Sequence, residues 1–295
     1  MLKLDYSLVD VFARHPLSGN SLTVFLLDQA LPTALMQAIT RELRQFETIF
    51  LQRAQDDVHH EARIFTVDEE LDFAGHPMLG AAAVLHAHLW PQSEAVNLSL
   101  QTRHKRVALH SHQYQGQFQV SMDQGSAEWG PPVPEVAWDA LLAATQLCRD
   151  DLAPGLPLQV VSTGLPYLII PVVQGLERAR PTARDFDTLL ASVGAKFSYV
   201  VDVNTLEARS WDNLGQVEDI ATGSAAGPAA AYLVEHGRAV QGETLSLHQG
   251  RFVQRPSEIQ VSVGPNLQVT VHGQVCPVGG GHLRLPQPAQ EPQNS

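Results

Sequence analysis

A short segment of this sequence occurs twice, about half a chain apart. Residues 72–85 read Asp-Phe-Ala-Gly-His-Pro-Met-Leu-Gly-Ala-Ala-Ala-Val-Leu, and residues 219–233 read Asp-Ile-Ala-Thr-Gly-Ser-Ala-Ala-Gly-Pro-Ala-Ala-Ala-Tyr-Leu. With Thr222 as an insertion, Gly75 aligns with Gly223, 148 residues later in a chain of 295. Chance similarity between two Ala-rich helices would give the same match. A duplicated fold also gives it, and that interpretation predicts two similar halves.

Both copies of the repeat predict a helix, over residues 77–89 and 225–236. Each helix is small or apolar on nearly all sides, which predicts burial rather than a place on the surface. The segments around them have strand-like patterns, so a buried helix suggests a sheet curled around it. We therefore predict an α+β fold with two similar halves, each a curled, mostly antiparallel or mixed sheet wrapped around a central helix. Further helices are predicted over 32–44, 138–147 and 186–193, and the Pro-rich stretch 130–134 is the predicted linker.

Each predicted central helix follows a glycine and begins with a polar residue, His76 or Ser224. Pro77 suits the first helical position, and Pro228 is expected in the first turn of the second helix. A buried helix N-terminus offers free N–H groups and partial positive charge, which favour a bound carboxylate. If the halves are related by an approximate twofold axis, both N-termini could face one cleft.

Three side chains are candidates for acid/base chemistry. Glu47 stands between Phe46 and Ile49 at the start of a strand-like segment, and partial burial suits a carboxyl group to proton transfer. A solvent-facing Glu on an alternating strand, or a capping partner, would show the same spacing. His76 is either functional or a capping residue, and Asp219 is either functional or an acid placed for the helix dipole. Asp72 aligns with Asp219 in the repeat and is a secondary candidate.

Composition excludes several functions. The formal net charge is −12, which disfavours nucleic acid and anionic membrane surfaces as partners. No apolar run is long enough for a membrane span and the N-terminus lacks signal-peptide features, so we expect a cytoplasmic protein. The two cysteines, Cys148 and Cys276, do not indicate a disulfide framework. No metal motif and no dinucleotide fingerprint occur, so we expect neither a metal nor an organic cofactor.

Motifs along nearly the whole chain resemble those of the PhzF-like isomerase family of phenazine biosynthesis, whose fold is like that of diaminopimelate epimerase. The matching segments are 9–12, 19–20, 47–48, 63–66, 73–77, 218–227, 249–250 and 255–257. The resemblance implies two halves, which we assign to residues 1–126 and 127–277. A strand near 278–286 would return to the first half, and 287–295 would be a loose Pro- and Gln-rich tail.

The resemblance also implies roles for particular residues. Glu47 would be the acid/base group, with His76 and Asp219 as its catalytic partners. The substrate would be a small carboxylate held in a site between the halves, and in the phenazine enzyme it is a dihydro-hydroxyanthranilate. No cofactor is implied, and a homodimer is compatible with the family. The residues expected at the substrate are Asn20, Gly75, Thr222, Gly223 and Ser224.

Some positions depart from the family pattern and leave the substrate open. Phe46 replaces a small polar residue before the Glu, Ser21 replaces a common Pro, and 211–214 lack an aromatic-x-Pro motif. Related epimerases use two cysteines, and the corresponding positions here are His76 and Ser224, which argues against their chemistry. An epimerase or racemase of an amino acid, and a non-catalytic binding protein on the same fold, stay as alternatives.

Overall fold

The computed structural model describes residues 1–53 and 58–286. Its first half is a curled sheet that closes on itself, because its first strand pairs with both the second and the last strand. The strands, in their order around this sheet, are β1 (Leu2–Val11), β2 (Asn20–Leu27), β3 (Glu47–Arg53), β4 (His59–Phe65), β6 (Ala95–Gln101), β7 (Arg106–Tyr114), β8 (Gln117–Ser126) and β16 (Gln268–Leu285), with β5 (Glu70–Leu71) added to β4.

The second half is built from a separate sheet and two strands that extend the first one. The separate sheet has the order β13-β12-β11-β10-β9. Of the other two strands, β15 pairs with the start of β16, and β14 pairs with β15. A single bridge between Glu207 and His248 joins the two groups along their free edges. The bounds are β9 (Glu128–Pro132), β10 (Gln159–Ser162), β11 (Pro166–Val172), β12 (Phe197–Asp202), β13 (Ala208–Ser210), β14 (Thr244–Gln249) and β15 (Ser257–Val263).

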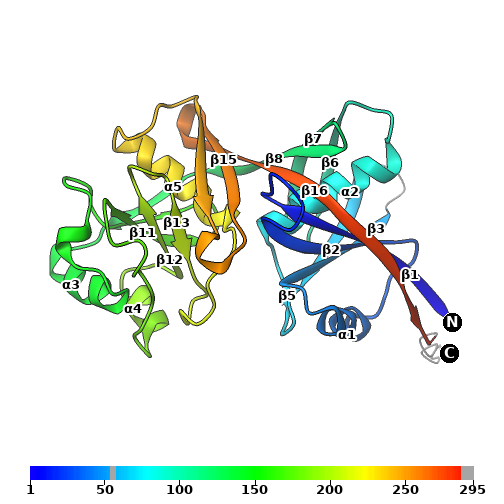
Figure 1. Ribbon diagram of the computed structural model, residues 1–295, viewed down its shortest axis with the longest axis horizontal. Coiled ribbons are helices and arrows are strands. Elements are labelled where there is room, and N and C mark those ends of the chain that lie inside the picture. Colours follow the sequence, from blue (N-terminus) through cyan, green and yellow to red (C-terminus); the bar gives the residue numbers. More distant parts are fainter. Residues whose placement is uncertain (54–57, 287–295) are drawn as a thin grey trace.

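One helix lies at the centre of each half (Figure 1). These are α2 (Gly75–Leu89) and α5 (Gly223–Glu235), and they correspond to the two copies of the sequence repeat. Every residue of α2 from Gly75 to His86 is buried, as is nearly all of α5 up to Leu233. The predicted α+β fold, with curled sheets around two buried helices, is confirmed.

Two long strands cross between the halves, as Figure 1 shows for β8 and β16. Residues 268–275 of β16 pair with β8, and residues 275–285 pair with β1. The predicted linker at 130–134 is wrong, because its first residues belong to β9. This strand lies at the end of its sheet, where proline is tolerated because the missing N–H has no ladder partner to lose.

The remaining helices cover the outside of the two sheets. Helix α1 (Thr33–Leu43) packs over a small core of its own, whereas α3 (Glu135–Ala144) and α4 (Phe186–Ser192) cover the outer face of the five-stranded sheet. The largest core is continuous and contains residues of both central helices. Short 3-10 turns occur at Arg149–Asp151, Arg251–Val253 and Pro265–Leu267.

The start of α5 differs from the sequence prediction. The helix begins at Gly223, so Pro228 is its sixth residue and lies in the second turn rather than the first. Proline has no N–H to donate to the carbonyl four residues earlier, which here belongs to Ser224.

No helix within residues 1–53 and 58–286 combines the length and the apolar character that a membrane span requires.

Candidate active site

The two central helices begin next to each other, at one cavity between the halves. A Cβ atom placed on Gly75 would lie 4.0 Å from the backbone nitrogen of Ser224. Neither helix has a side-chain cap or an acidic residue in its first turn. Unpaired N–H groups of both helices therefore lie close together, and an anion is their natural partner. The cavity has a volume of about 620 Å³.

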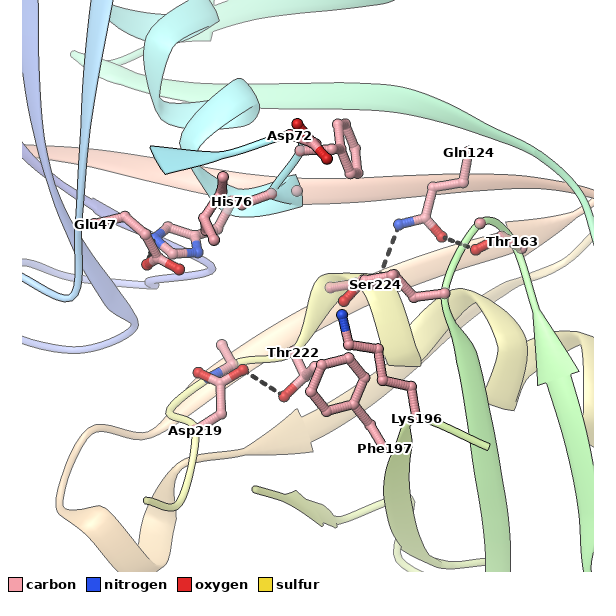
Figure 2. Close-up of a pocket in the computed structure, with 18 of the residues that line it drawn as sticks. Glu47, Asp72, His76, Gln124, Thr163, Lys196, Phe197, Asp219, Thr222 and Ser224 are labelled. Carbon is pink, nitrogen blue, oxygen red and sulfur yellow. Dashed lines mark hydrogen bonds and ion pairs between the residues drawn. The ribbon is translucent and has the colours of Figure 1, made fainter. Parts of the chain in front are cut away.

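Glu47 and His76 form a close pair on the first-half side of this cavity (Figure 2). Glu47 is the first residue of β3, and its side chain is 13% exposed. Its Oε2 lies 3.1 Å from Nε2 of His76, but the two groups are not aligned as a hydrogen bond. Neither atom has a hydrogen-bond partner in the part of the chain that the structure describes. Both atoms are therefore available to a substrate, because buried polar groups are normally paired.

Asn20 connects this pair to the second half. Its Nδ2 lies 3.4 Å from Nδ1 of His76 and 3.5 Å from Oδ1 of Asp219. An Asn20 amide that donates to both neighbours requires His76 to accept at Nδ1, and a neutral imidazole in that arrangement has its N–H at Nε2, on the side of Glu47. A chain of polar groups thus runs from Glu47 through His76 and Asn20 to Asp219.

Asp219 stands just before helix α5, on the opposite side of the cavity from Glu47. Its Oδ2 accepts a hydrogen bond of 2.6 Å from the hydroxyl of Thr222, which is itself fixed by Gln249. Desolvation by the surrounding protein raises the pKa of Asp219, and the nearby charge of Glu47 raises it further. The Thr222 hydrogen bond and His76 oppose this shift. The protonated acid is consequently favoured more than it would be in water.

Ser224 is held by a buried tyrosine. The hydroxyls of Ser224 and Tyr167 lie 2.7 Å apart, and Tyr167 comes from β11 beneath the cavity. Burial raises the pKa of Tyr167 far above its usual range. A neutral tyrosine can fix the position of Ser224, but it is too weak an acid to make Ser224 a proton-transfer group.

The crossing strand β8 also contributes to the site. Nε2 of Gln124 donates a hydrogen bond of 2.9 Å to the carbonyl of Gly223, and its Oε1 accepts one from Thr163. Gln124 therefore ties the start of α5 to a strand that is shared by both halves.

Within the described residues, no three His, Cys, Asp or Glu side chains come close enough together to bind one metal ion.

Comparison with known proteins identifies the family. A family model described as phenazine biosynthesis-like protein (PhzC-PhzF) matches residues 9–281. The trans-2,3-dihydro-3-hydroxyanthranilate isomerase of Pseudomonas fluorescens is 32% identical over 267 residues, which cover 86% of this chain and 88% of that protein. This chain belongs to the phenazine biosynthesis-like family. Its relatives include named isomerases, and the predicted membership of the family is confirmed.

Solved structures agree with this membership. A predicted epimerase from Pseudomonas aeruginosa is 48% identical, with a TM-score of 0.89 over 96% of this chain and 100% of that one. A hydroxyproline epimerase from Agrobacterium vitis is only 12% identical, with a TM-score of 0.60 over 95% of this chain and 91% of that one, and it shows the fold alone. The family fold is therefore that of a wider group of racemases and isomerases.

The structure brings most of the predicted site residues of this family member to the same cavity. Asn20 lies behind it, in contact with His76 and Asp219. Asp72 is at its rim, with a side chain that is 72% exposed and paired with His104. Phe46 is 44% exposed and is not among the described residues that line the cavity. Those that line it are Glu47, Gly75, His76, Asp219, Thr222, Gly223 and Ser224.

Several residues at the site were not predicted from the sequence. Gln249 belongs to a segment that carries the family resemblance, so its role could have been sought there. Gln124 and Tyr167 lie on ordinary strands, and no sequence signal marks them. Lys105 and Lys196 also line the cavity, and each is preceded and followed by residues without any recognisable motif.

Proposed function

We propose that this chain catalyses a cofactor-independent proton shift on a small carboxylate substrate that is cyclic or unsaturated, in the manner of a dihydro-hydroxyanthranilate. The proposal rests on one observation above all: Glu47 Oε2 and His76 Nε2, 3.1 Å apart, have no hydrogen-bond partner within the described residues while lying at the cavity where two helices begin. A charged group and an imidazole without partners are costly to bury, and a substrate that binds both would offset this cost.

The proposed reaction begins with substrate binding. The substrate carboxylate accepts hydrogen bonds from backbone N–H groups at Gly75, Gly223 and Ser224, where the positive ends of two helix dipoles meet. This places the carbon skeleton beside Glu47. The side chains of Asn20 and Thr222 hold His76 and Asp219 in position around it.

The proton shift itself needs one group that both accepts and returns a proton. The Glu47 carboxylate removes a proton from a carbon next to a conjugated system, and the electron pair of the broken C–H bond moves along that system. Glu47, now protonated, returns the proton to a more distant carbon, so that no atom is gained or lost. His76 donates a hydrogen bond from Nε2 to the developing negative charge, and Asp219 orients the substrate from the other side.

The test is turnover of trans-2,3-dihydro-3-hydroxyanthranilate, followed by proton NMR in D₂O. We expect Glu47→Gln to lower the rate by about 100- to 10,000-fold, with substrate binding within roughly tenfold of wild type. Glu69→Gln is the matched control, because Glu69 also lines the cavity but is exposed. Full activity of Glu47→Gln would contradict the acid/base role, and loss in Asp219→Asn alone would move that role to Asp219.

The same measurement in D₂O, made with an amino acid as the substrate, separates this reaction from epimerisation. An epimerase exchanges a proton at one stereocentre and needs acid/base groups on both faces of that carbon. The second face here offers Ser224, held by a tyrosine whose pKa is raised. Deuterium incorporated at an unshifted α-carbon of an amino acid would support epimerisation instead.

A further inference from the structure

Lysine is rare in this chain but concentrated at the cavity. The sequence contains three lysines, Lys3, Lys105 and Lys196, although lysine and arginine together number 19. Lys105 precedes β7 in the first half, Lys196 precedes β12 in the second, and both line the cavity. A chain of net charge −12 has therefore placed two of its three lysines at one site, one from each half.

Both cavity lysines lie over aromatic rings that line the same space. Nζ of Lys105 is 4.0 Å from the ring centroid of Phe73, and Nζ of Lys196 is 5.3 Å from that of Phe197. Figure 2 shows the Lys196 side chain extending from β12 toward the start of helix α5. A cation held over an aromatic face loses part of its freedom, which prepares it for an anionic ligand.

Neither cavity lysine forms a salt bridge with a carboxylate of the described residues, although acidic side chains line the same cavity. Those acids have other partners at the rim: Glu70 binds Arg63, and Asp72 binds His104. All three lysines are exposed, but Lys3, in contrast, pairs with Asp5 at 2.9 Å. Both ammonium groups are thus without an ion-pair partner among the described carboxylates, although Glu47, Glu69 and Asp219 also line the cavity.

We propose that Lys105 and Lys196 bind a second anionic group of the substrate, which makes the substrate a dianion. This inference rests on the proposed function, in which the helix starts bind the first carboxylate. Phe73 and Phe197 would contact the carbon skeleton between the two anionic groups, so a planar ring or a conjugated chain fits best. A mono-carboxylate such as dihydro-hydroxyanthranilate would leave both ammonium groups without a counter-charge, so we expect it to be a poorer substrate than a dianion of the same skeleton.

The experiment compares binding of benzoate with that of isophthalate and 3-phosphonobenzoate by calorimetry at pH 7.5. We expect isophthalate to bind wild type at least tenfold tighter than benzoate. Lys105→Gln and Lys196→Gln should each weaken isophthalate by about tenfold, which corresponds to about 1.4 kcal/mol, and benzoate by less than roughly threefold. Lys3→Gln is the matched control and should change neither.

The comparison of isophthalate with 3-phosphonobenzoate identifies the second anionic group of the substrate. Tighter binding of isophthalate than of the phosphonate indicates a carboxylate, and the reverse order indicates a phosphate. Equal affinity for benzoate and isophthalate, or isophthalate binding that neither cavity variant weakens, would overturn the inference and leave the proposed function intact. Failure of all three acids to bind would contradict both, whereas loss of turnover in Glu47→Gln with lysine-dependent binding retained supports both.

Discussion

Two acidic side chains face each other across the cavity in different surroundings. Glu47 has an oxygen without a hydrogen-bond partner among the described residues, whereas both oxygens of Asp219 are within reach of donors from Asn20 and Thr222. Desolvation raises the pKa of Asp219. Different environments of this kind allow two carboxyl groups at one site to take different roles, one in proton exchange with a substrate and one in holding it.

The raised pKa of Asp219 predicts how stability depends on pH. Because the folded protein holds this proton more tightly than the unfolded chain, stability is full below the ordinary Asp range and falls as pH rises through the folded pKa. Asp219→Asn removes the ionising carboxyl group and with it this pH-dependent loss of stability. The stability of the variant relative to wild type should therefore rise between about pH 4 and neutral pH. Urea unfolding at several pH values measures it.

Asp72→Asn serves as the control for this prediction. Asp72 occupies the equivalent position in the repeat, but its side chain is 72% exposed. The stability difference between Asp72→Asn and wild type should therefore change little over the same pH range. A difference that is equally flat for Asp219→Asn would mean that the folded protein does not hold the Asp219 proton more tightly.

Sequence reasoning reached part of the site at the level of residues. Glu47, His76 and Asp219 were candidates because each sits beside a recognisable pattern, an apolar strand or a helix start, and the family resemblance implied their roles. Folding alone brings Tyr167, Gln124 and the two cavity lysines to the site, so no local pattern in the sequence marks them. No spacing rule relates Lys105 to Lys196, which are 91 residues apart, because the cavity forms between two halves.

At the level of elements, the central helices were the most predictable feature. An all-round apolar helix has to be buried, and this constraint holds without any knowledge of its partners. The strand-like segments on both sides then indicate a sheet around it. The Pro-rich strand β9 was missed because local composition marks it as a turn. Its pairing with β10 is a long-range contact, and tertiary pairing overrides the local preference there.

Gly80 tests how tightly α2 fits its sheet. A Cβ atom at this position would lie 2.4 Å from Cδ2 of Leu22 and 3.0 Å from Cγ2 of Val11. Gly80→Val should therefore lower the free energy of unfolding by about 1–3 kcal/mol through overpacking. Gly279→Val is the control, since a Cβ there would meet nothing within 4 Å. Equal midpoints in chemical denaturation for the two variants would contradict the expected crowding.

At the level of the whole molecule, the halves are joined by more than the two crossing strands. The guanidinium of Arg255, from the second half, binds the carboxylate of Asp10 at 2.7 Å and the carbonyls of Ser18 and Gly19. Asp10 is only 2% exposed. These contacts fix the loop that leads into Asn20, so the site depends on how the halves are held together.

The Asp10–Arg255 pair gives a test of that dependence. Arg255→Met should cost about 3 kcal/mol of stability, because it leaves a buried carboxylate with one hydrogen-bond donor, the N–H of Leu17. Releasing the loop should also displace Asn20 and lower turnover. The double variant Asp10→Asn/Arg255→Met removes the unpaired charge, so it should be destabilised less than the sum of the single variants. Its turnover should stay low, because the carbonyls of Ser18 and Gly19 still lack their donor. Recovery of turnover together with stability would instead mean that Arg255 acts only through Asp10 and not through the loop.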